Sequence, residues 1–364
     1  MGLTPPDVPA PPLADLGGWP FVIGRLMRNE SLSADQAAAA LDDILEGNAT
    51  SAQIAAFAVG LRMKGETVEE MTGLVRAMLD HAEPVDPPVG VEVIDTCGTG
   101  GDRSHSINVS TIAAFVAAGA GARVCKHGNR AASSAAGSAD VLEALGVVID
   151  LGPAGVARCI VEAGMGFCFA PRYHAASRHA VPTRRELGVP TVFNFLGPLA
   201  NPARPRRQVV GVSDGAMAEK VLGVLQANGA TTAMVVYGHD GLDELTTTDA
   251  STVLALADGS VRTFVVDPVE MGLALTPLDA LRGGDPTTNA GLARRVLEGE
   301  PGPHRDIVLL NAAAAVVVAG LADDLVDGLL VAARSVDSGR AGEVLDRLVE
   351  VSKAAKVSED AGRG

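Results

Sequence analysis

The hydrophobic positions between Trp19 and about His81 are spaced as in α-helices. Apolar residues recur there at intervals of three and four, as in the stripe Met71, Leu74, Val75, Met78 and Leu79. Capping boxes, in which a hydroxyl residue stands three positions before a Glu or Gln, mark helix starts at Ser33 with Gln36, Thr50 with Gln53, and Thr67 with Glu70. Since prolines follow at 84, 87 and 88, the pattern predicts a small all-helical domain over residues 19–85.

From about residue 90 the pattern changes to short β-rich runs that alternate with helical segments. The expected strands are 91–94, 122–125, 167–170, 209–212 and 233–237, and the expected helices include 110–118, 139–145 and 216–226. Such alternation is typical of a mainly parallel sheet flanked by helices. Two further runs, 253–257 and 261–266, predict a hairpin, so the sheet should be mixed. With helices expected from Pro277 onward, a large α/β domain should cover residues 90–355.

The two ends of the chain differ from these domains. Residues 1–18 contain five prolines and no Lys or Arg, so they lack the basic start and apolar centre of a signal peptide. We therefore expect a disordered tail over 1–18. The short polar segment 356–364 is expected to be a second, flexible tail.

Composition narrows the classes of function. The 364 residues carry 44 acidic and 29 basic side chains, a formal charge of −15, which disfavours nucleic acid and anionic membranes as partners. No apolar run reaches the roughly 18 residues of a membrane span. The four cysteines lack Cys-x-x-Cys spacing, so we expect them to be buried thiols in a protein of the reducing cytoplasm. A phosphate ligand would need a local pocket of backbone amides and selected cations.

The segment from Asp95 to Ser138 has the composition of such a pocket. Asp95-Thr96-Cys97-Gly98-Thr99-Gly100-Gly101-Asp102 follows an expected strand, and its glycines leave N–H groups free to approach an anion. Asn108-Val109-Ser110-Thr111 begins a helix, where the dipole favours phosphate. Lys126-His127-Gly128-Asn129-Arg130 adds a dense set of donors. The loop lacks the spacing of a Walker motif or of a dinucleotide fingerprint, so neither ATP nor NAD is expected.

These motifs, together with Asp243-Glu244, Phe193-Asn194-Phe195-Leu196-Gly197-Pro198-Leu199 and Asn201-Pro202, resemble anthranilate phosphoribosyltransferases in order and spacing. The resemblance runs from about residue 20 to residue 350. It implies the nucleoside phosphorylase/phosphoribosyltransferase type of α/β fold, in which a segment near 175–195 joins the helical domain. It also implies an active site in the hinge cleft between the domains, and homodimers joined through the small domains. The implied reaction transfers the phosphoribosyl group of phosphoribosyl pyrophosphate (PRPP) to anthranilate, in tryptophan biosynthesis.

The resemblance also implies a set of site residues. For PRPP they are Gly98, Gly101, Asp102, Ser106, Asn108, Val109, Ser110, Thr111, Lys126, His127, Gly128, Asn129, Arg130, Ala131, Ala132, Ser133, Ser134 and Ser138. For anthranilate they are Gly98, Asn129 and Arg184, with His127 lining the same cavity. For Mg²⁺ they are Ser110, Asp243 and Glu244. Arg103 departs from the family, many members of which have a small residue at this position.

The expected chemistry agrees with these residue types. Asp243-Glu244 follows the expected strand 233–237, and Mg²⁺ prefers phosphate oxygens with one or two carboxylates. Lys126 is a suitable point charge for phosphate, and Arg184 can pair with a carboxylate through two hydrogen bonds. An aromatic amine is neutral at pH 7, so no strong base is required, although His127 is a candidate to accept or relay its proton. Lys126, His127, Asp243 and Glu244 are thus the candidate catalytic residues.

Three alternatives remain open at this stage. The first is a pyrimidine nucleoside phosphorylase-like enzyme, which would usually carry a further C-terminal domain. The second is a related transferase with another aromatic amine as acceptor, and the third is a non-catalytic binding protein. Association with the glutamine amidotransferase of anthranilate synthase is also left open.

Overall fold

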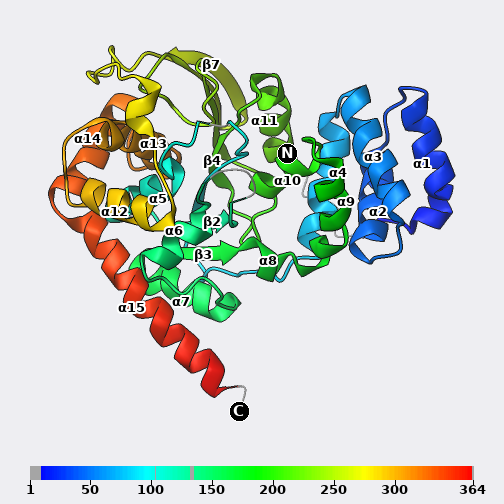
Figure 1. Cartoon of the computed structure of the whole chain (residues 1–364), viewed down its shortest axis with the longest axis horizontal. Helices are drawn as coiled ribbons and strands as arrows, with labels where there is room; N and C mark the ends of the chain where they lie inside the picture. Colours follow the sequence, from blue (N-terminus) through cyan, green and yellow to red (C-terminus); the bar gives the residue numbers. More distant parts are fainter. Residues whose placement is uncertain (1–9, 103, 132–134, 363–364) are drawn as a thin grey trace. The chain divides into compact units, whose positions relative to one another are not determined.

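The computed structural model describes residues 10–102, 104–131 and 135–362. The chain divides into two compact units. The helical unit comprises Met1–Pro84, Ala170–Pro202 and Lys220–Gly229, and the α/β unit comprises Val85–Phe169, Ala203–Glu219 and Ala230–Gly364. Figure 1 shows the elements of both units.

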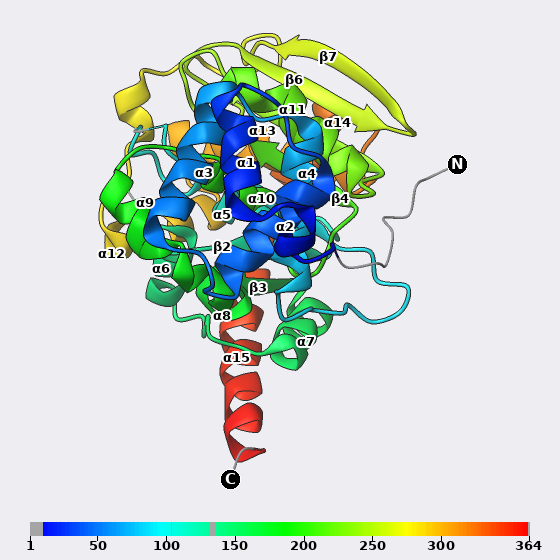
Figure 2. The same cartoon turned by 90° about the vertical axis from the view of Figure 1, so that its right-hand side faces the viewer.

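The first part of the helical unit consists of one short 3₁₀ helix and four α-helices. They are η1 (Leu13–Leu16), α1 (Gly18–Met27), α2 (Ala34–Leu45), α3 (Ser51–Lys64) and α4 (Val68–Asp80). Helix α2 packs against α4, and α1 packs against α3 (Figure 2). All three predicted capping boxes are present, each with both of its reciprocal hydrogen bonds. The helical domain predicted from the spacing of apolar residues is therefore confirmed.

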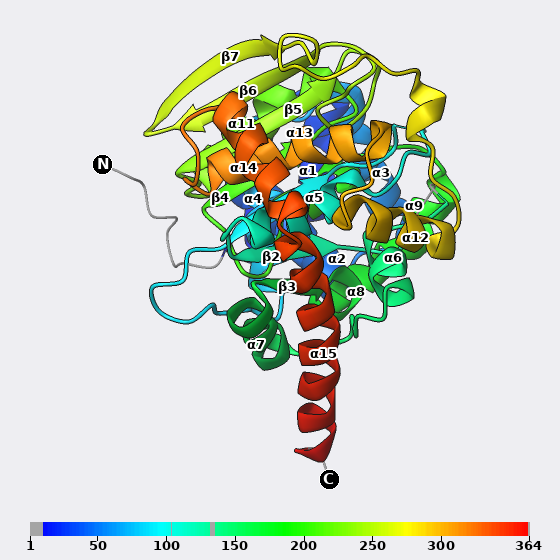
Figure 3. The same cartoon turned by 90° about the vertical axis from the view of Figure 1, so that its left-hand side faces the viewer.

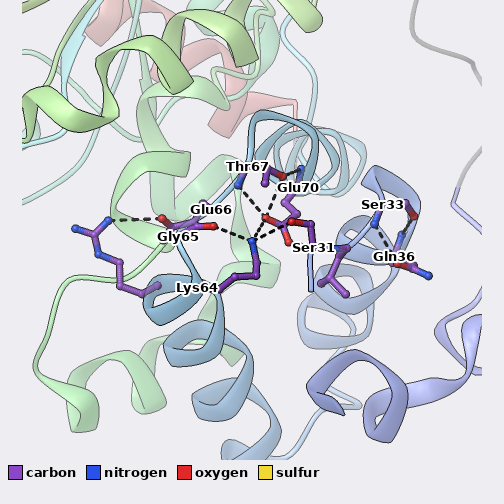
Figure 4. Close-up of polar contacts among 10 residues, drawn as sticks. Ser31, Ser33, Gln36, Lys64, Gly65, Glu66, Thr67 and Glu70 are labelled. Atoms are coloured by element: carbon purple, nitrogen blue, oxygen red, sulfur yellow. Dashed lines mark hydrogen bonds and ion pairs between the residues drawn. The ribbon is translucent and has the colours of Figure 1, made fainter. Parts of the chain in front are cut away.

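A buried ion pair joins the start of α4 to the end of α3 (Figure 4). Lys64 Nζ donates to Glu70 Oε2 over 2.9 Å, and the two side chains are 4% and 0% exposed. Glu70 also accepts from the backbone N–H groups of Leu32 and Thr67 over 2.8 Å. Because every charge has partners, this pair avoids the cost of an isolated buried ion.

Two later segments complete the helical unit. The first holds α8 (Ala170–Tyr173), η2 (Ala175–His179), α9 (Val181–Leu187) and α10 (Phe193–Leu199). The second is most of α11 (Ala218–Ala227), where a Cβ at Gly223 would touch Val68 of α4. The segment 170–202 includes the stretch near 175–195, whereas the sequence contained no signal that placed 220–229 in this unit.

The α/β unit is built on a seven-stranded mixed sheet in the order β3-β2-β1-β4-β5-β6-β7. The strands are β1 (Ile94–Gly98), β2 (Val124–Gly128), β3 (Met165–Phe169), β4 (Arg207–Gly211), β5 (Thr232–Gly238), β6 (Ser251–Ala257) and β7 (Ser260–Val266). Strands β1 to β5 run parallel, and β5, β6 and β7 are antiparallel, so the predicted hairpin and mixed sheet are confirmed. Strand order reverses between β1 and β4, which is where open α/β sheets bind ligands.

Helices flank this sheet. They are α5 (Val109–Gly119), α6 (Ser138–Ala144), α7 (Pro153–Ala163), η3 (Gly215–Met217), η4 (Leu278–Leu281), α12 (Pro286–Leu297), α13 (Pro303–Val318), α14 (Leu325–Asp337) and α15 (Arg340–Ala361). Helix α5 contacts β1 and β2, and α13 contacts β1, β4 and β5. Helix α5 and residues 307–316 of α13 are mostly apolar and buried, so they form the centre of the core.

The structure corrects the predicted ends of the chain. Helix α15 extends to Ala361 and packs along α7, so residues 356–361 are helical and not a flexible tail (Figure 3). At the other end, residues 13–16 form η1, and Leu13 is 6% exposed. Burial of Leu13 orders the first segment, and a 2.8 Å hydrogen bond from Gly152 N to Glu359 Oε1 ties the last turns of α15 to the start of α7.

The first three strands begin or end away from their predicted positions. Strand β1 was expected at 91–94 but lies at Ile94–Gly98, because pairing with β4 continues through Gly98. Strand β2 likewise ends at Gly128, three residues beyond the expected run. Lys126 and His127 therefore lie within a strand and not in the loop after it. The helix α7 between β2 and β3 was not predicted.

No helix in residues 10–102, 104–131 and 135–362 is both long enough and apolar enough to cross a membrane. All four cysteines are buried free thiols, as expected.

Candidate functional site

The glycine loop leaves the carboxyl end of β1 at the point where the strand order reverses. Gly100 and Gly101 have φ values of 66° and 85°, a region that residues with a side chain rarely adopt. Ser213, which follows β4, donates from its Oγ to Gly100 O over 2.9 Å and from its N–H to Thr99 Oγ1 over 3.2 Å. The loop is thus held across the two strands at the switch point.

Asp243 and Glu244 lie against this loop, in the connection between β5 and β6. Gly100 N donates to Asp243 Oδ2 over 2.7 Å, and Ser110 N at the start of α5 donates to Glu244 Oε1 over 3.1 Å. A Cβ at Gly98 would overlap the Asp243 carboxylate. The predicted grouping of Gly98, Ser110 and the acidic pair is therefore present in the α/β unit.

The two carboxyl groups are held in an environment that favours their neutral forms. Burial and repulsion from Asp102 raise the pKa of Asp243 to about 6. Burial and repulsion from Asp243 raise the pKa of Glu244 well above its usual value, although the charge of Lys126 acts in the opposite direction. A cation bound to both carboxylates would offset these unfavourable interactions.

The oxygen donors at this place fit Mg²⁺ better than a metal ion whose ligands all come from the protein. Across the ranges that the structure describes, no group of three or more His, Cys, Asp or Glu side chains is arranged to hold a metal ion. Mg²⁺ commonly binds one or two carboxylates and completes its shell with water and substrate phosphates. Asp243, Glu244 and the Ser110 hydroxyl supply hard oxygen donors of this kind.

Lys126 brings a buried positive charge to the same place. Its side chain is 2% exposed, and its Nζ donates to Thr96 O and, over 3.3 Å, to Ser110 Oγ. His127, which follows it in β2, is 5% exposed, and its backbone N–H donates to the buried Asp95 carboxylate over 3.2 Å. The bonds from Lys126 and His127 join β2 to β1, so both candidate catalytic residues are held by the sheet.

The start of α5 has no capping side chain of its own. Asn108 occupies the N-cap position, yet its Nδ2 donates to Ala136 O over 3.1 Å and its side chain does not cap the helix. Val109 is buried, and the buried Thr111 Oγ1 has no hydrogen-bond partner among the described residues. The Glu244 carboxylate takes the place of a cap at Ser110 N. The helix start is thus capped by an acidic residue of the connection between β5 and β6.

Asp102 and Ser106 are linked through Ser104. The Ser104 hydroxyl donates to Asp102 Oδ2 over 2.8 Å and lies within hydrogen-bonding distance of Ser106 Oγ, at 3.1 Å. Ser106 also pairs with Arg282 in an isolated β-bridge. Asp102 also raises the pKa of Asp243 by repulsion between the two carboxylates. These polar groups therefore connect the acidic pair with the glycine loop. Arg103 lies outside the described residues.

The loop after β2 is tied to α6. Arg130 Nη1 donates to Asp140 Oδ1 over 2.8 Å and to Glu143 Oε2 over 2.9 Å, so these carboxylates compete with a phosphate for its guanidinium. Ala131 N donates to Asp140 Oδ2 over 2.9 Å, and Ser138 Oγ donates to Asn129 O over 3.3 Å. Ala132, Ser133 and Ser134 lie outside the described residues. Asp140 was not predicted; it lies in the first turn of α6, where the helix dipole favours a carboxylate.

Arg184 belongs to the helical unit, unlike the other predicted residues. It lies on α9, and its guanidinium stands over the Phe193 ring, 5.3 Å from the centroid. Burial lowers its pKa from the ordinary value, although an arginine remains charged at neutral pH. The aromatic ring orients the guanidinium, and Phe193 is the first residue of the motif that ends at Leu199.

Comparisons with known proteins agree with this geometry. Residues 90–342 match the family model "Glycosyl transferase family, a/b domain", and residues 21–82 match "Glycosyl transferase family, helical bundle domain". A protein of Rhodococcus opacus (strain B4) named anthranilate phosphoribosyltransferase is 55% identical over 92% of this chain and 93% of its own length. One of Thermobifida fusca (strain YX) with the same name is 52% identical over 92% and 97%.

Solved structures give the same result. The anthranilate phosphoribosyltransferase of Thermus thermophilus has a TM-score of 0.86 and 40% identity, over 91% of this chain and 99% of that chain. The enzyme of Saccharomyces cerevisiae, solved in complex with PRPP and Mg, has a TM-score of 0.83 and 27% identity, over 92% and 98%. With two matching domains, this site and relatives above half identity over most of its length, the chain belongs to the anthranilate phosphoribosyltransferase family.

Proposed function

We propose that the chain transfers the phosphoribosyl group of PRPP to the amine nitrogen of anthranilate. A bond forms between this nitrogen and C1 of the ribose, the bond from C1 to the pyrophosphate oxygen breaks, and one amine proton is released. The products are N-(5-phosphoribosyl)anthranilate and pyrophosphate. Negative charge grows on the leaving pyrophosphate while the sugar becomes cation-like, so the site must stabilise the former and place the amine accurately.

The observation that carries this proposal is a set of hydrogen bonds. Asp243 is bonded to the glycine loop and Glu244 to the start of α5, where Lys126 also binds. In this arrangement Asp243, Glu244 and Ser110 would hold Mg²⁺, which supplies positive charge to pyrophosphate oxygens when bound. Lys126 and the N–H groups of the glycine loop would bind the phosphates directly. The other predicted PRPP residues that the structure describes belong to the glycine loop, the start of α5 and the segment from β2 to the start of α6.

For the acceptor, Arg184 would pair with the anthranilate carboxylate, and Gly98 and Asn129 would contact the ring and amine. The position of Arg184 over Phe193 restricts the guanidinium, which favours a planar two-bonded pair. His127 remains the candidate for receiving the amine proton. The yeast enzyme has been solved with 4-fluoroanthranilate, which supports an acceptor of this class.

The test is the loss of anthranilate fluorescence when protein, PRPP and MgCl₂ are mixed, with EDTA as the control. A decay that requires all three components is expected. Asp243→Asn should reduce kcat/KM by at least about a hundredfold, because charge stabilisation by a metal is worth several kcal/mol. Asp249→Asn, at an exposed acid of the same connection, is the matched control. Decay that persists in EDTA would remove the metal from the proposal. Metal-dependent PRPP binding without decay would indicate another acceptor.

We also propose a homodimer joined through the helical units. Met27 at the end of α1 is 82% exposed and Met63 near the end of α3 is 84% exposed, and these two helices pack together. Burying these two apolar side chains against a second copy of the chain would contribute favourable free energy. The free thiols support a cytoplasmic location.

A further inference from the structure

Asn311 is a polar residue in the middle of an apolar, buried helix. It lies on α13, where residues 307 to 310 and 312 to 316 are all apolar and buried, and is itself 3% exposed. Burying an amide costs free energy unless its donors and acceptor are paired. A leucine has the same branched skeleton without this requirement, so the amide needs a specific explanation.

The partners of the amide lie in the connection that carries the acidic pair. Asn311 Oδ1 accepts from Leu245 N over 2.9 Å, and Asn311 Nδ2 donates to Leu245 O over 2.8 Å. The second hydrogen of Nδ2 is used by Ile307 O, at 2.9 Å, one turn earlier in α13. The backbone N–H and C=O of Leu245 are thus both bound by one side chain, as a neighbouring strand would bind them. The bond to Ile307 O holds the amide in a fixed orientation on α13.

Leu245 directly follows Glu244. It is fully buried, and the next N–H, that of Thr246, donates to Ser251 Oγ over 2.8 Å. Helix α13 rests on β1, β4 and β5, which include the strands that form the switch point. A clamp on Leu245 therefore sets the position of the adjacent acidic pair relative to the glycine loop at the end of β1.

We propose that Asn311 is a positioning residue that holds Asp243 and Glu244 in place for the metal and pyrophosphate. This inference rests on the proposed role of the two carboxylates in binding Mg²⁺. Partners that orient metal-binding groups strongly affect metal affinity even though they do not touch the metal.

The test compares the intact protein with Asn311→Leu, which keeps the branched skeleton and removes all three hydrogen bonds. Asn311→Ser is a second variant that leaves room for water to satisfy Leu245 and is expected to fold if the first does not. Without metal, hydrogen exchange of the backbone N–H groups in residues 243–248 should become faster. The Mg²⁺ concentration for half-maximal activity should rise by about tenfold or more, while the KM for anthranilate should change by less than about twofold.

Ser335→Ala is the matched control, because it removes another buried hydrogen bond of the same helical layer, the 2.8 Å bond from Ser335 Oγ to Val116 O. It should lower stability without changing the Mg²⁺ dependence or exchange in 243–248. Unchanged exchange and unchanged Mg²⁺ dependence in a folded Asn311 variant would overturn the proposal. A wild-type enzyme that needs no Mg²⁺ would refute the proposed metal role, and the exchange measurement alone would then decide whether Asn311 anchors the segment.

Discussion

The residue type of Arg184 suggested a carboxylate partner, but the sequence did not reveal where the side chain lies. Its sequence context, with Arg185 and Glu186 beside it, is that of an exposed charged helix. In the structure Arg184 is half-buried over Phe193, whereas Arg185 is exposed. An aromatic ring nine residues away restricts one guanidinium and leaves its neighbour in solvent. This difference arises from packing within the helical unit.

Arg184→Ala should therefore raise the KM for anthranilate far more than the KM for PRPP. Loss of hydrogen bonds to a charged group costs about 1.5–3 kcal/mol, which corresponds to roughly a tenfold to hundredfold increase. Initial rates measured against each substrate in turn provide the check. Arg185→Ala on the same helix should leave both constants nearly unchanged. Equal increases in the two KM values for Arg184→Ala would contradict the proposed contact.

At the scale of elements, helix starts were the most predictable feature. A capping box needs only residues three positions apart, and the three that were predicted all formed. What the spacing could not reveal is that one of them is buried. Glu70 of the Thr67 box is 0% exposed and also binds Lys64, while the Ser33 box is exposed (Figure 4).

Thr67→Ala should consequently destabilise the protein more than Ser33→Ala. Loss of a capping residue typically costs about 1 kcal/mol, and at Thr67 the buried carboxylate of Glu70 also loses a hydrogen-bond donor. Urea unfolding followed by circular dichroism would give both free energies. A larger loss for Ser33→Ala would show that the exposed cap is the stronger one and that the buried network adds nothing.

For the whole molecule, the exposed methionines of the helical unit lead to a prediction about assembly. Light scattering after size exclusion should give twice the 37.0 kDa of the chain. Met27→Glu combined with Met63→Glu should shift the protein toward the monomer, since charges would be buried at the contact. Leu330→Glu, at a 55% exposed position of α14 in the α/β unit, is the control and should remain dimeric. A dimer that survives the methionine changes would place the interface elsewhere.

Much of the architecture could be predicted from the order of elements alone. Alternating strands and helices followed by a hairpin predicted a mixed sheet, and the sheet has that form. The strand ends were harder to predict. Pairing with neighbouring strands extends β1 and β2 into segments that contain glycine, where the apolar pattern predicts loops. The error mattered for the site, since it moved Lys126 and His127 from a loop into a strand.

The amino-acid sequence by itself determined the three capped helix starts of the helical unit, most of the alternation of elements and the chemical types present at the site, because these depend on neighbours within a few positions. Only the tertiary structure decided how the site is assembled. Gly100 meets Asp243, Ser110 meets Glu244, and Asn311 meets Leu245 across separations of 143, 134 and 66 residues. Such contacts depend on which strands become neighbours and which helix covers them, and burial of the whole core settles both.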